Sequence, residues 1–402
     1  MTAPDIPVER LGAGYFADPH SVHARLRAQR PVTPVVLPGG PGAWLITGYA
    51  EARAALADPR LSKHMPGWHP EPDSIIAALD LHMLNSDPPD HERLRKLVNK
   101  AFTARRVERL RPRITAITAG LLEAMPAHRG RRVQAEVDLL ASFAFPLPIT
   151  VICELLGIPA GDRDDFRTWS ATIVSNAAAP GVFQAHAIAM ARYFTALLAA
   201  KRREPRDDLL SALIAARDEQ DRLSENELVS MAFLLLVAGH ETTVNLIASG
   251  VLALLLNPGE LARLRADHSL LGAAVEELLR YVNPVNNATF RFTGEPVEIG
   301  GVPIGPGEVV LVSLSGANRD PARYADADRL DLGRDSGGHL AFGHGIHYCL
   351  GAPLARLEAE IAFTGLLERF GSMTLAVPPD ALRWRPSTLI HGLESLPVRL
   401  YG

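Results

Sequence analysis

Cysteine is scarce in this chain, with two in 402 residues. Cys153 and Cys349 could pair, but we expect free thiols, because the chain shows no secretory signal and cytosolic thiols stay reduced. Residues 1–11 hold proline and acidic side chains and no apolar run, which predicts no signal peptide, no membrane anchor and a cytoplasmic protein. An excess of basic charge is also missing, and the net charge of −4 argues against nucleic acid as a partner.

The composition that remains is ordinary for a globular protein, 47% hydrophobic and 21% charged. The length would suit two or three domains or a single large one. No internal repeat or low-complexity linker divides the chain, so we expect one domain over residues 1–402. A chain of this size buries roughly three quarters of its unfolded surface and can enclose a large ligand.

Helical periodicity dominates the chain, with short β segments beside it. Apolar runs around Pro38–Gly42 predict a β-hairpin between Pro31 and Thr47, and a second β region runs from Val297 to Leu314. The periodicity predicts helices at 91–111, 113–125, 136–156, 184–203, 224–256, 260–265, 272–282 and 353–370. The expected fold is therefore mainly α with small β-sheets.

The helix predicted at 224–256 is the longest. Ser224 and Glu227 fit a capping box at its start, and the residues Asn-Pro-Gly at 257–259 supply its end. Its interior is apolar almost all round, which predicts burial. A transmembrane helix is disfavoured, because His240 and Glu241 stand at its middle, where charge is most costly.

A glycine-rich loop surrounds Cys349. The residues from 342 to 351 read Phe-Gly-His-Gly-Ile-His-Tyr-Cys-Leu-Gly, and a helix with proline in its first turn follows directly. Cys349 would thus lie at a helix N-terminus, which favours a thiolate. The glycines allow a tight loop and a close approach to a bulky flat ligand. A lone cysteine of this kind would more often be structural, but the surrounding ten residues favour a functional one.

This loop resembles the haem-binding loop of the cytochrome P450 family. Phe342, Gly345, Cys349 and Gly351 match its F-x-x-G-x-x-x-C-x-G pattern at every fixed position, and His347 stands where the family places an Arg or His on a haem propionate. The resemblance implies the cytochrome P450 fold and a haem b cofactor whose iron is held by Cys349. In such enzymes the thiolate favours O–O cleavage.

A second motif, Ala-Gly-His-Glu-Thr-Thr at 238–243, interrupts the apolar interior of the long helix. Gly239 and a buried carboxylate both disfavour a helix core, and such conflicts are expected at functional sites. One alternative is a helix kink in which Thr242 bonds back to the Ala238 carbonyl. The motif resembles the family's oxygen-binding groove, which implies that Glu241 and Thr242 form the acid–alcohol pair that delivers protons to dioxygen.

A third motif is the pair Glu277 and Arg280, which share one helix face. Spacing alone would allow Glu276 to pair with Arg280 equally well. The resemblance to the family's E-x-x-R motif selects Glu277, and implies that Arg334 completes a buried ion network. His91 with Arg95, and Arg291, similarly resemble the family's propionate contacts, although any one alone would more often be structural.

The resemblance implies a monooxygenase that inserts one oxygen atom of O2 into a C–H bond or an alkene of a small, apolar natural product of the polyketide or macrolide type. It implies a ferredoxin and a ferredoxin reductase as electron donors, and we expect a monomer. One alternative is a peroxide-driven haem enzyme, and another is a haem protein that binds ligand without turnover. The presence of Glu241 and Thr242 disfavours both.

Two surfaces follow from the resemblance. The substrate pocket would include Leu235, Ala238, Val285, Asn286, Asn287 and Leu389. Between His91 and Arg113 nine Arg and Lys face only two Glu, a local excess of +7 (9 − 2) in an acidic chain. This is either a solvated helix face or the docking surface of an acidic ferredoxin, which opposite charge would steer into place.

Overall fold

The computed structural model describes residues 6–65, 79–125, 135–215 and 223–401. Its principal helices are α1 (Pro19–Gln29), α2 (Tyr49–Ala57), α4 (Asp90–Ala101), α5 (Ala104–Arg109), α6 (Arg111–Ala124), α7 (Pro146–Leu156), α8 (Arg163–Ile173), α9 (Pro180–Arg203), α10 (Leu209–Ala215), α11 (Glu225–Leu256), α12 (Pro258–Ala266), α13 (Leu271–Val282), α14 (Leu314–Asn318) and α15 (Ala352–Arg369).

The strands are short and form three sheets. They are β1 (Glu9–Arg10), β2 (Val32–Val36), β3 (Gly42–Ile46), β4 (Leu61–Ser62), β5 (Ala135–Asp138), β6 (Arg291–Thr293), β7 (Val297–Ile299), β8 (Val302–Ile304), β9 (Val309–Val312), β10 (Ser372–Leu375) and β11 (Pro397–Tyr401). The largest sheet has the order β1-β2-β3-β9-β6-β4, and the others are β10-β11-β5 and β7-β8.

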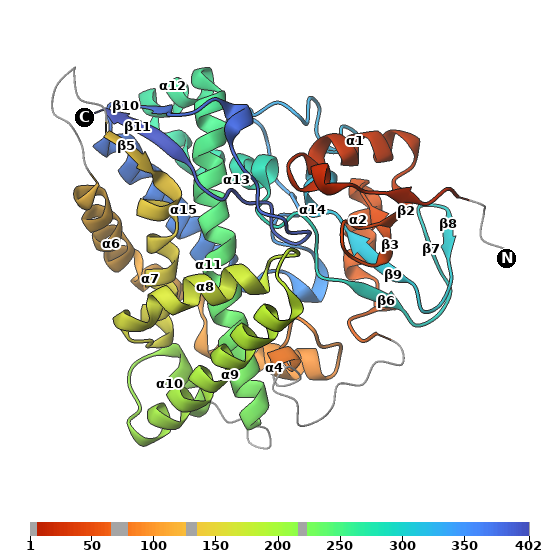
Figure 1. The fold of residues 1–402 in the computed structure, drawn as a ribbon, viewed down its shortest axis with the longest axis horizontal. Helices are drawn as coiled ribbons and strands as arrows, with labels where there is room; N and C mark the ends of the chain where they lie inside the picture. Colours follow the sequence, from red (N-terminus) through yellow and green to blue (C-terminus); the bar gives the residue numbers. More distant parts are fainter. Residues whose placement is uncertain (1–5, 66–78, 126–134, 216–222, 402) are drawn as a thin grey trace.

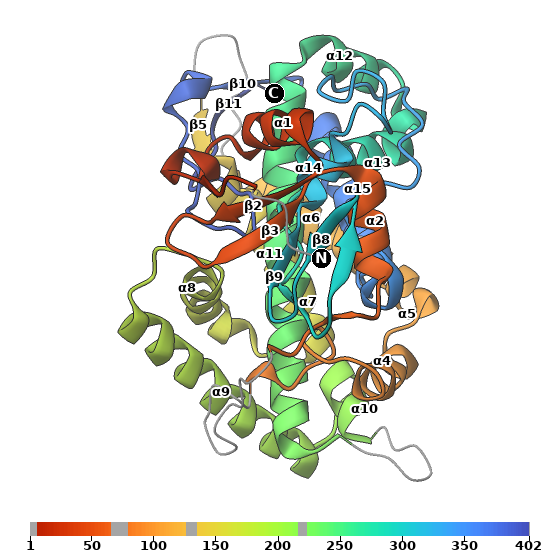
Figure 2. The same cartoon turned by 90° about the vertical axis from the view of Figure 1, so that its right-hand side faces the viewer.

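Figure 1 shows a helical body on one side and a lobe containing most of the β structure on the other. The large sheet, the β7–β8 hairpin, α1 and α2 form the lobe, and the long helices form the body. Figure 2, seen from the side of the lobe, shows α11 running through the molecule behind it. Helices α7, α9, α13 and α15 pack against α11, which makes it the axis of the core.

Helix α11 begins at a capping box formed by Ser224 and Glu227. The Ser224 side chain accepts a hydrogen bond from the Glu227 N–H at 3.2 Å, and the Glu227 carboxylate accepts one from the Ser224 N–H at 2.7 Å. This is the predicted capping box, which satisfies N–H groups that have no partner within the helix. By length and composition α11 could cross a membrane, but 67% of its most apolar window is buried inside the protein.

The predicted hairpin and second β region are present, and strands β2 and β3 pair with Val32 opposite Ile46. Two predicted helices are wrong in part. The segment 91–111 breaks at Phe102, where Thr103 caps a new helix by accepting from the Arg106 N–H. The segment 136–156 begins as strand β5, because residues 135–138 pair with β11 at the other end of the chain. Helices α1, α2, α8, α10 and α14 were not predicted.

Candidate active site

The loop before α15 places Cys349 at the start of that helix. The Cys349 N–H donates to the Phe342 carbonyl at 2.9 Å, and this bond closes the loop on itself. Gly343 and Gly345 have φ angles of +71° and +73°, a region that side chains with a Cβ disfavour. A Cβ on Gly345 would also lie 2.9 Å from the Leu56 carbonyl oxygen of α2. The expected tight loop is therefore present, and it packs closely on α2.

Cys349 is an exposed residue, although protein atoms crowd around its thiol. Burial raises the pKa of Cys349, while the N–H groups of Gly351 and Ala352 and the charge of Arg95 oppose that rise. The helix N-terminus thus favours the thiolate as expected, but burial outweighs it. Cys153 is also a free thiol, and burial raises its pKa to about 12. Cys349 is therefore the more accessible of the two.

Four side chains with positive or titratable groups converge beside the Cys349 loop. The rings of His91, from α4, and His347 lie 4.4 Å apart between centroids. Arg95 donates to the Tyr348 carbonyl at 2.7 Å. Arg291, from β6, is buried and donates to the Leu61 and Leu56 carbonyls, each at 3.2 Å. The structure therefore brings together the predicted propionate contacts His91, Arg95, Arg291 and His347.

Several buried nitrogens in this cluster have no partner within the described protein. They are both ring nitrogens of His91, Nε2 of His347 and Nε of Arg291. Unpaired buried polar groups are costly and rare, so these nitrogens suit a ligand that brings carboxylate oxygens. Within the described ranges no group of three or more His, Cys, Asp or Glu is arranged to hold a metal ion. Cys349 supplies a thiol, a side chain that can ligate haem iron.

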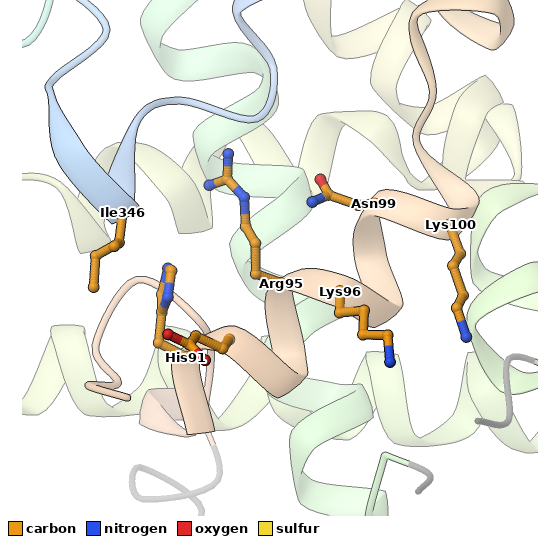
Figure 3. A pocket seen from close by; sticks show the side chains of 7 residues that line it. His91, Arg95, Lys96, Asn99, Lys100 and Ile346 are labelled. Carbon is orange, nitrogen blue, oxygen red and sulfur yellow. The ribbon is translucent and has the colours of Figure 1, made fainter. Parts of the chain in front are cut away.

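An open pocket of about 530 Å³ lies on the outer side of this cluster, between α4 and the loop. Figure 3 shows Arg95 pointing to one side of α4, while Lys96 and Lys100 point to the other. The lining residues are His91, Glu92, Arg95, Lys96, Asn99, Lys100 and Ile346. The basic segment is less charged than its sequence indicates, because Arg93, Arg111 and Arg113 pair with Glu227, Glu360 and Glu154 from other segments. These three acids reduce the local excess of positive charge from +7 to +4 (7 − 3).

The middle of α11 carries the predicted acid and alcohol. Thr242 donates to the Ala238 carbonyl at 3.0 Å. This is the hydrogen bond to the preceding turn that the sequence allows as an alternative to a functional role. Ala238 is exposed and Thr242 is half-buried, although the helix around them is buried. The two residues are one turn apart, so an open strip of α11 contains the alcohol.

Glu241 lies on the other side of that strip and is 4% exposed. Its carboxylate accepts from Ser170 at 3.0 Å and from Arg385 at 3.1 Å, and His240 Nε2 lies 3.6 Å away. Burial alone would raise the pKa of Glu241, but His240, Arg385 and Ser170 outweigh it and lower the pKa to about 2. In this arrangement the Glu241 carboxylate is bonded to Ser170 and Arg385 rather than to Thr242.

Ser170 and Arg385 were not among the predicted site residues. Ser170 lies in α8, and Arg385 lies in the segment after β10, where it also donates to Asn245 at 3.1 Å. No local sequence signal marks either residue, because their role depends on how distant segments pack. Gly239 has a packing role in the structure. A Cβ on Gly239 would lie 2.8 Å from Ile152, so this glycine lets α7 approach α11.

The pair Glu277 and Arg280 is fully buried. Both of its hydrogen bonds measure 2.7 Å, and Arg334 lies 3.3 Å from the same carboxylate. The alternative partner, Glu276, binds Arg356 of α15 and His339 instead. Arg280 donates to the Asn318 carbonyl, and the Asn318 side chain accepts from the Leu340 N–H at 2.7 Å. The ion network therefore reaches the beginning of the Cys349 loop.

The predicted pocket residues lie in two neighbouring segments and on α11. The Asn286 N–H donates to the Leu389 carbonyl at 2.8 Å, which places the segments 285–287 and 388–390 side by side. Val285 and Leu389 are half-buried, and Leu235 is 9% exposed. Asn286 and Asn287 are buried, and their amides bind Tyr15, Ser315 and the Thr388 carbonyl. These bonds join the lobe to the chain segment after β10, and neither amide needs a ligand to satisfy it.

Comparison with known proteins gives consistent matches. A family model described as Cytochrome P450 matches residues 186–380. Cytochrome P450 107B1 of Saccharopolyspora erythraea is 51% identical, over 99% of this chain and 99% of that protein. Mycinamicin IV hydroxylase/epoxidase of Micromonospora griseorubida is 44% identical, over 95% and 97%. The structure of the tirandamycin C-bound P450 monooxygenase TamI is 52% identical and has a TM-score of 0.90, over 98% of this chain and 100% of that one.

Proposed function

Because the chain belongs to the cytochrome P450 family, as a haem b oxidoreductase that uses dioxygen and redox partners on small molecules, we propose that it hydroxylates or epoxidises an apolar natural product of the polyketide or macrolide type. The observation that carries this proposal is the free, exposed Cys349 at a helix N-terminus, beside a cluster of basic groups with nitrogens that have no partner among the described residues. A thiol in that position can bind iron, and the cluster can bind carboxylates.

The residues that would hold the haem divide into two groups. Cys349 is the iron ligand, and Phe342, Gly345 and Gly351 shape the loop that presents it. His91, Arg95, Arg291 and His347 bind the propionates through nitrogens that otherwise have no partner, or through donors beside them. When bound, the haem supplies a redox-active iron, and its cysteinate ligand favours O–O cleavage.

Glu241 and Thr242 would control the protons. The Thr242 hydroxyl donates to Ala238, so its lone pairs can accept a hydrogen bond from a group in the open strip. Glu241 is a poor proton donor while His240, Arg385 and Ser170 hold its pKa low. Its carboxylate must turn away from Arg385, take up a proton from water and pass it toward the Thr242 hydroxyl. Arg385 and Ser170 are then positioning residues for this relay.

The ion network of Glu277, Arg280 and Arg334 would support the haem loop. Its hydrogen bonds through Asn318 to Leu340 fix the backbone just before Phe342. The network makes no contact with the thiol, so its contribution is to keep the loop in one conformation.

The names of the relatives support the substrate class. One solved neighbour binds tirandamycin C, and one relative is named as a hydroxylase and epoxidase of mycinamicin IV. In this chain Ala238 is exposed on α11, and Val285 and Leu389 are half-buried apolar residues of two neighbouring segments. Asn286 and Asn287 would shape the pocket through their backbone rather than through their amides, which are already bonded.

A ferredoxin, reduced by a ferredoxin reductase, would be the electron donor. Exposed Arg105 and Arg109 of α5 keep the basic face between α4 and α6 positive, and α5 packs on α15, the helix that follows Cys349. We further propose a cytoplasmic monomer that folds as one domain over residues 1–402 and uses neither membrane nor nucleic acid.

The carbonyl complex of the reduced protein tests the haem site. We expect the far red-shifted Soret band of thiolate ligation in the wild type and in Cys153→Ala, and its loss in Cys349→Ala. Titration with a library of polyketide macrolides should then shift the haem spin state for compounds that bind. A thiolate band that survives Cys349→Ala, or a library in which only unrelated small molecules bind, would contradict the proposed ligand or the proposed substrate class respectively.

A further inference from the structure

Lys63 is a buried lysine whose ammonium group has no carboxylate partner among the residues that the structure describes. It follows β4 and is 9% exposed. Its Nζ contacts the Thr289 hydroxyl and lies 3.3 Å from the carbonyl oxygens of Thr289 and Phe290. The nearby carboxylate of Asp87 accepts instead from the Lys63 backbone N–H, at 2.9 Å, and from the Ser62 hydroxyl. A buried cation with only neutral acceptors is costly.

The position of Lys63 joins it to the basic cluster beside the Cys349 loop. Strand β4 pairs with β6, with Ser62 opposite Phe292, so Lys63 and Arg291 occupy neighbouring positions across the two strands. Burial, and then the charge of Arg291, lower the pKa of Lys63 to about 7. Arg291 is buried as well, and its Nε has no partner within the described protein. Lys63 therefore lies beside one of the predicted propionate contacts.

Among the described residues, one carboxylate serves the cations Lys63 and Arg291 together. Asp87 acts on both, and it is already hydrogen-bonded to the Lys63 backbone N–H and to the Ser62 hydroxyl. The other carboxylate that acts on Arg291 is Asp58, and it pairs with Arg60 at 2.7 Å. The propionates of haem b could supply the carboxylate that the Lys63 ammonium group does not contact in this structure.

We propose that Lys63 is a further haem-binding residue, whose ammonium group leaves Thr289 to donate to a propionate carboxylate. The inference rests on the haem site proposed above and adds to it a contact that no motif marks. It gives Lys63 a reason to be buried, because the partner that compensates its charge arrives with the cofactor. An ammonium group on a flexible four-carbon stem can make this change without movement of the backbone.

The test compares holoproteins that differ at Lys63 alone. Lys63→Gln keeps a donor for Thr289 but removes the charge, and Lys63→Arg keeps a charge. We expect haem transfer to excess apomyoglobin to be roughly tenfold faster from Lys63→Gln than from the wild type, for the loss of about 1.4 kcal/mol. The haem reduction potential should fall, because a cation that favours the reduced form is lost. Lys63→Arg should restore both values toward the wild type.

Two controls separate this role from a structural one. Arg10→Gln removes an exposed cation of β1, away from this cluster, and should change neither haem transfer nor the potential. Thr289→Val removes the hydroxyl that Lys63 contacts and should leave the potential unchanged. Wild-type transfer and potential in Lys63→Gln, or faster transfer in Thr289→Val equal to that in Lys63→Gln, would overturn the proposal. Absence of the thiolate carbonyl band in the wild type would instead overturn the haem site itself.

Discussion

Thr242 stands on the open strip of α11, one turn after Ala238. Replacement by alanine removes the hydroxyl but leaves the helix bond pattern of the backbone intact, so haem and substrate should bind as in the wild type. We expect NAD(P)H electrons to be diverted to hydrogen peroxide, with several-fold less product per NAD(P)H. Thr242→Ser, which retains a hydroxyl, should recover most of the coupling. Unchanged coupling in Thr242→Ala would show that the hydroxyl plays no part in proton delivery.

Glu241 would contribute to proton delivery through its carboxylate. Glu241→Gln keeps the size of the side chain and can still bind Ser170, but it cannot carry a proton between water and the Thr242 hydroxyl. We expect kcat to fall by about 10²-fold, the usual size of a general acid–base contribution, with unchanged substrate-induced spin shift. A solvent deuterium isotope effect on kcat larger than that of the wild type would identify proton delivery as the slowed step. A wild-type kcat would exclude this carboxylate from the relay.

Helix α13 contains two adjacent acids, Glu276 and Glu277, whose salt bridges differ in burial. Comparing variants of the two tests what burial of the bridge contributes. Glu277→Ala leaves Arg280 buried without its counter-ion, at a cost of roughly 3–5 kcal/mol. Glu276→Ala breaks a bridge to Arg356 that is about one third exposed, so we expect a cost of about 1 kcal/mol or less. Yields of haem-loaded protein and denaturant unfolding give the comparison. Equal stability of the two variants would show that the buried network does not support the haem loop.

Helices and strands could be predicted from the sequence where local signals determine them. The ends of α11 follow from a capping box and an Asn-Pro-Gly stop, both of which act within a few residues. Strand β5 could not be predicted, because its pairing with β11 depends on residues about 260 positions away, and such pairing overrides local propensity. The Cys349 loop and Glu277 were predicted from motifs. Ser170, Arg385 and Lys63 were not, since each acts through a contact between distant segments.

At the scale of the whole molecule, buried histidines should make the fold sensitive to acid. Burial lowers the pKa of His23 to about 3 and those of His82 and His391 to about 4, below the usual value near 6.5. These groups stay neutral in the folded protein, whereas the unfolded chain takes up their protons below pH 6.5. The free energy of unfolding should therefore decrease as the pH falls below about 6.5.

Variants of single histidines measure this dependence of stability on pH. At pH 5 one histidine with a folded pKa near 4 costs about 2 kcal/mol of stability relative to pH 7.5. His391→Phe, which keeps a ring to stack on Trp384, should reduce the loss of stability between these pH values by about that amount. Exposed His268→Phe should leave it unchanged. Denaturant unfolding at both pH values decides, and equal losses in His391→Phe and the wild type would contradict the assignment.

The charge distribution over the molecule makes the electron donor testable. We expect reduction by a ferredoxin to slow steeply as ionic strength rises, because salt screens the attraction between the basic face and an acidic partner. Arg105→Glu with Arg109→Glu should slow reduction at least tenfold at low salt without altering substrate binding. Arg192→Glu with Arg203→Glu, on exposed positions of α9, changes the net charge equally and should have little effect. Equal rates in the two double variants would place the donor elsewhere.

Strand β3 pairs with β2 on one side and with β9 on the other, with Trp44 opposite Val310. These partners are 266 residues apart (310 − 44), so β9 is still unmade when β3 leaves the ribosome. At 5–20 residues per second, roughly 13–50 s of synthesis pass before β9 can cover that edge. During this interval an apolar strand edge is open to pairing with neighbouring nascent chains. The rate of translation, and the chaperones that attend it, should therefore govern how much of this protein reaches its native state.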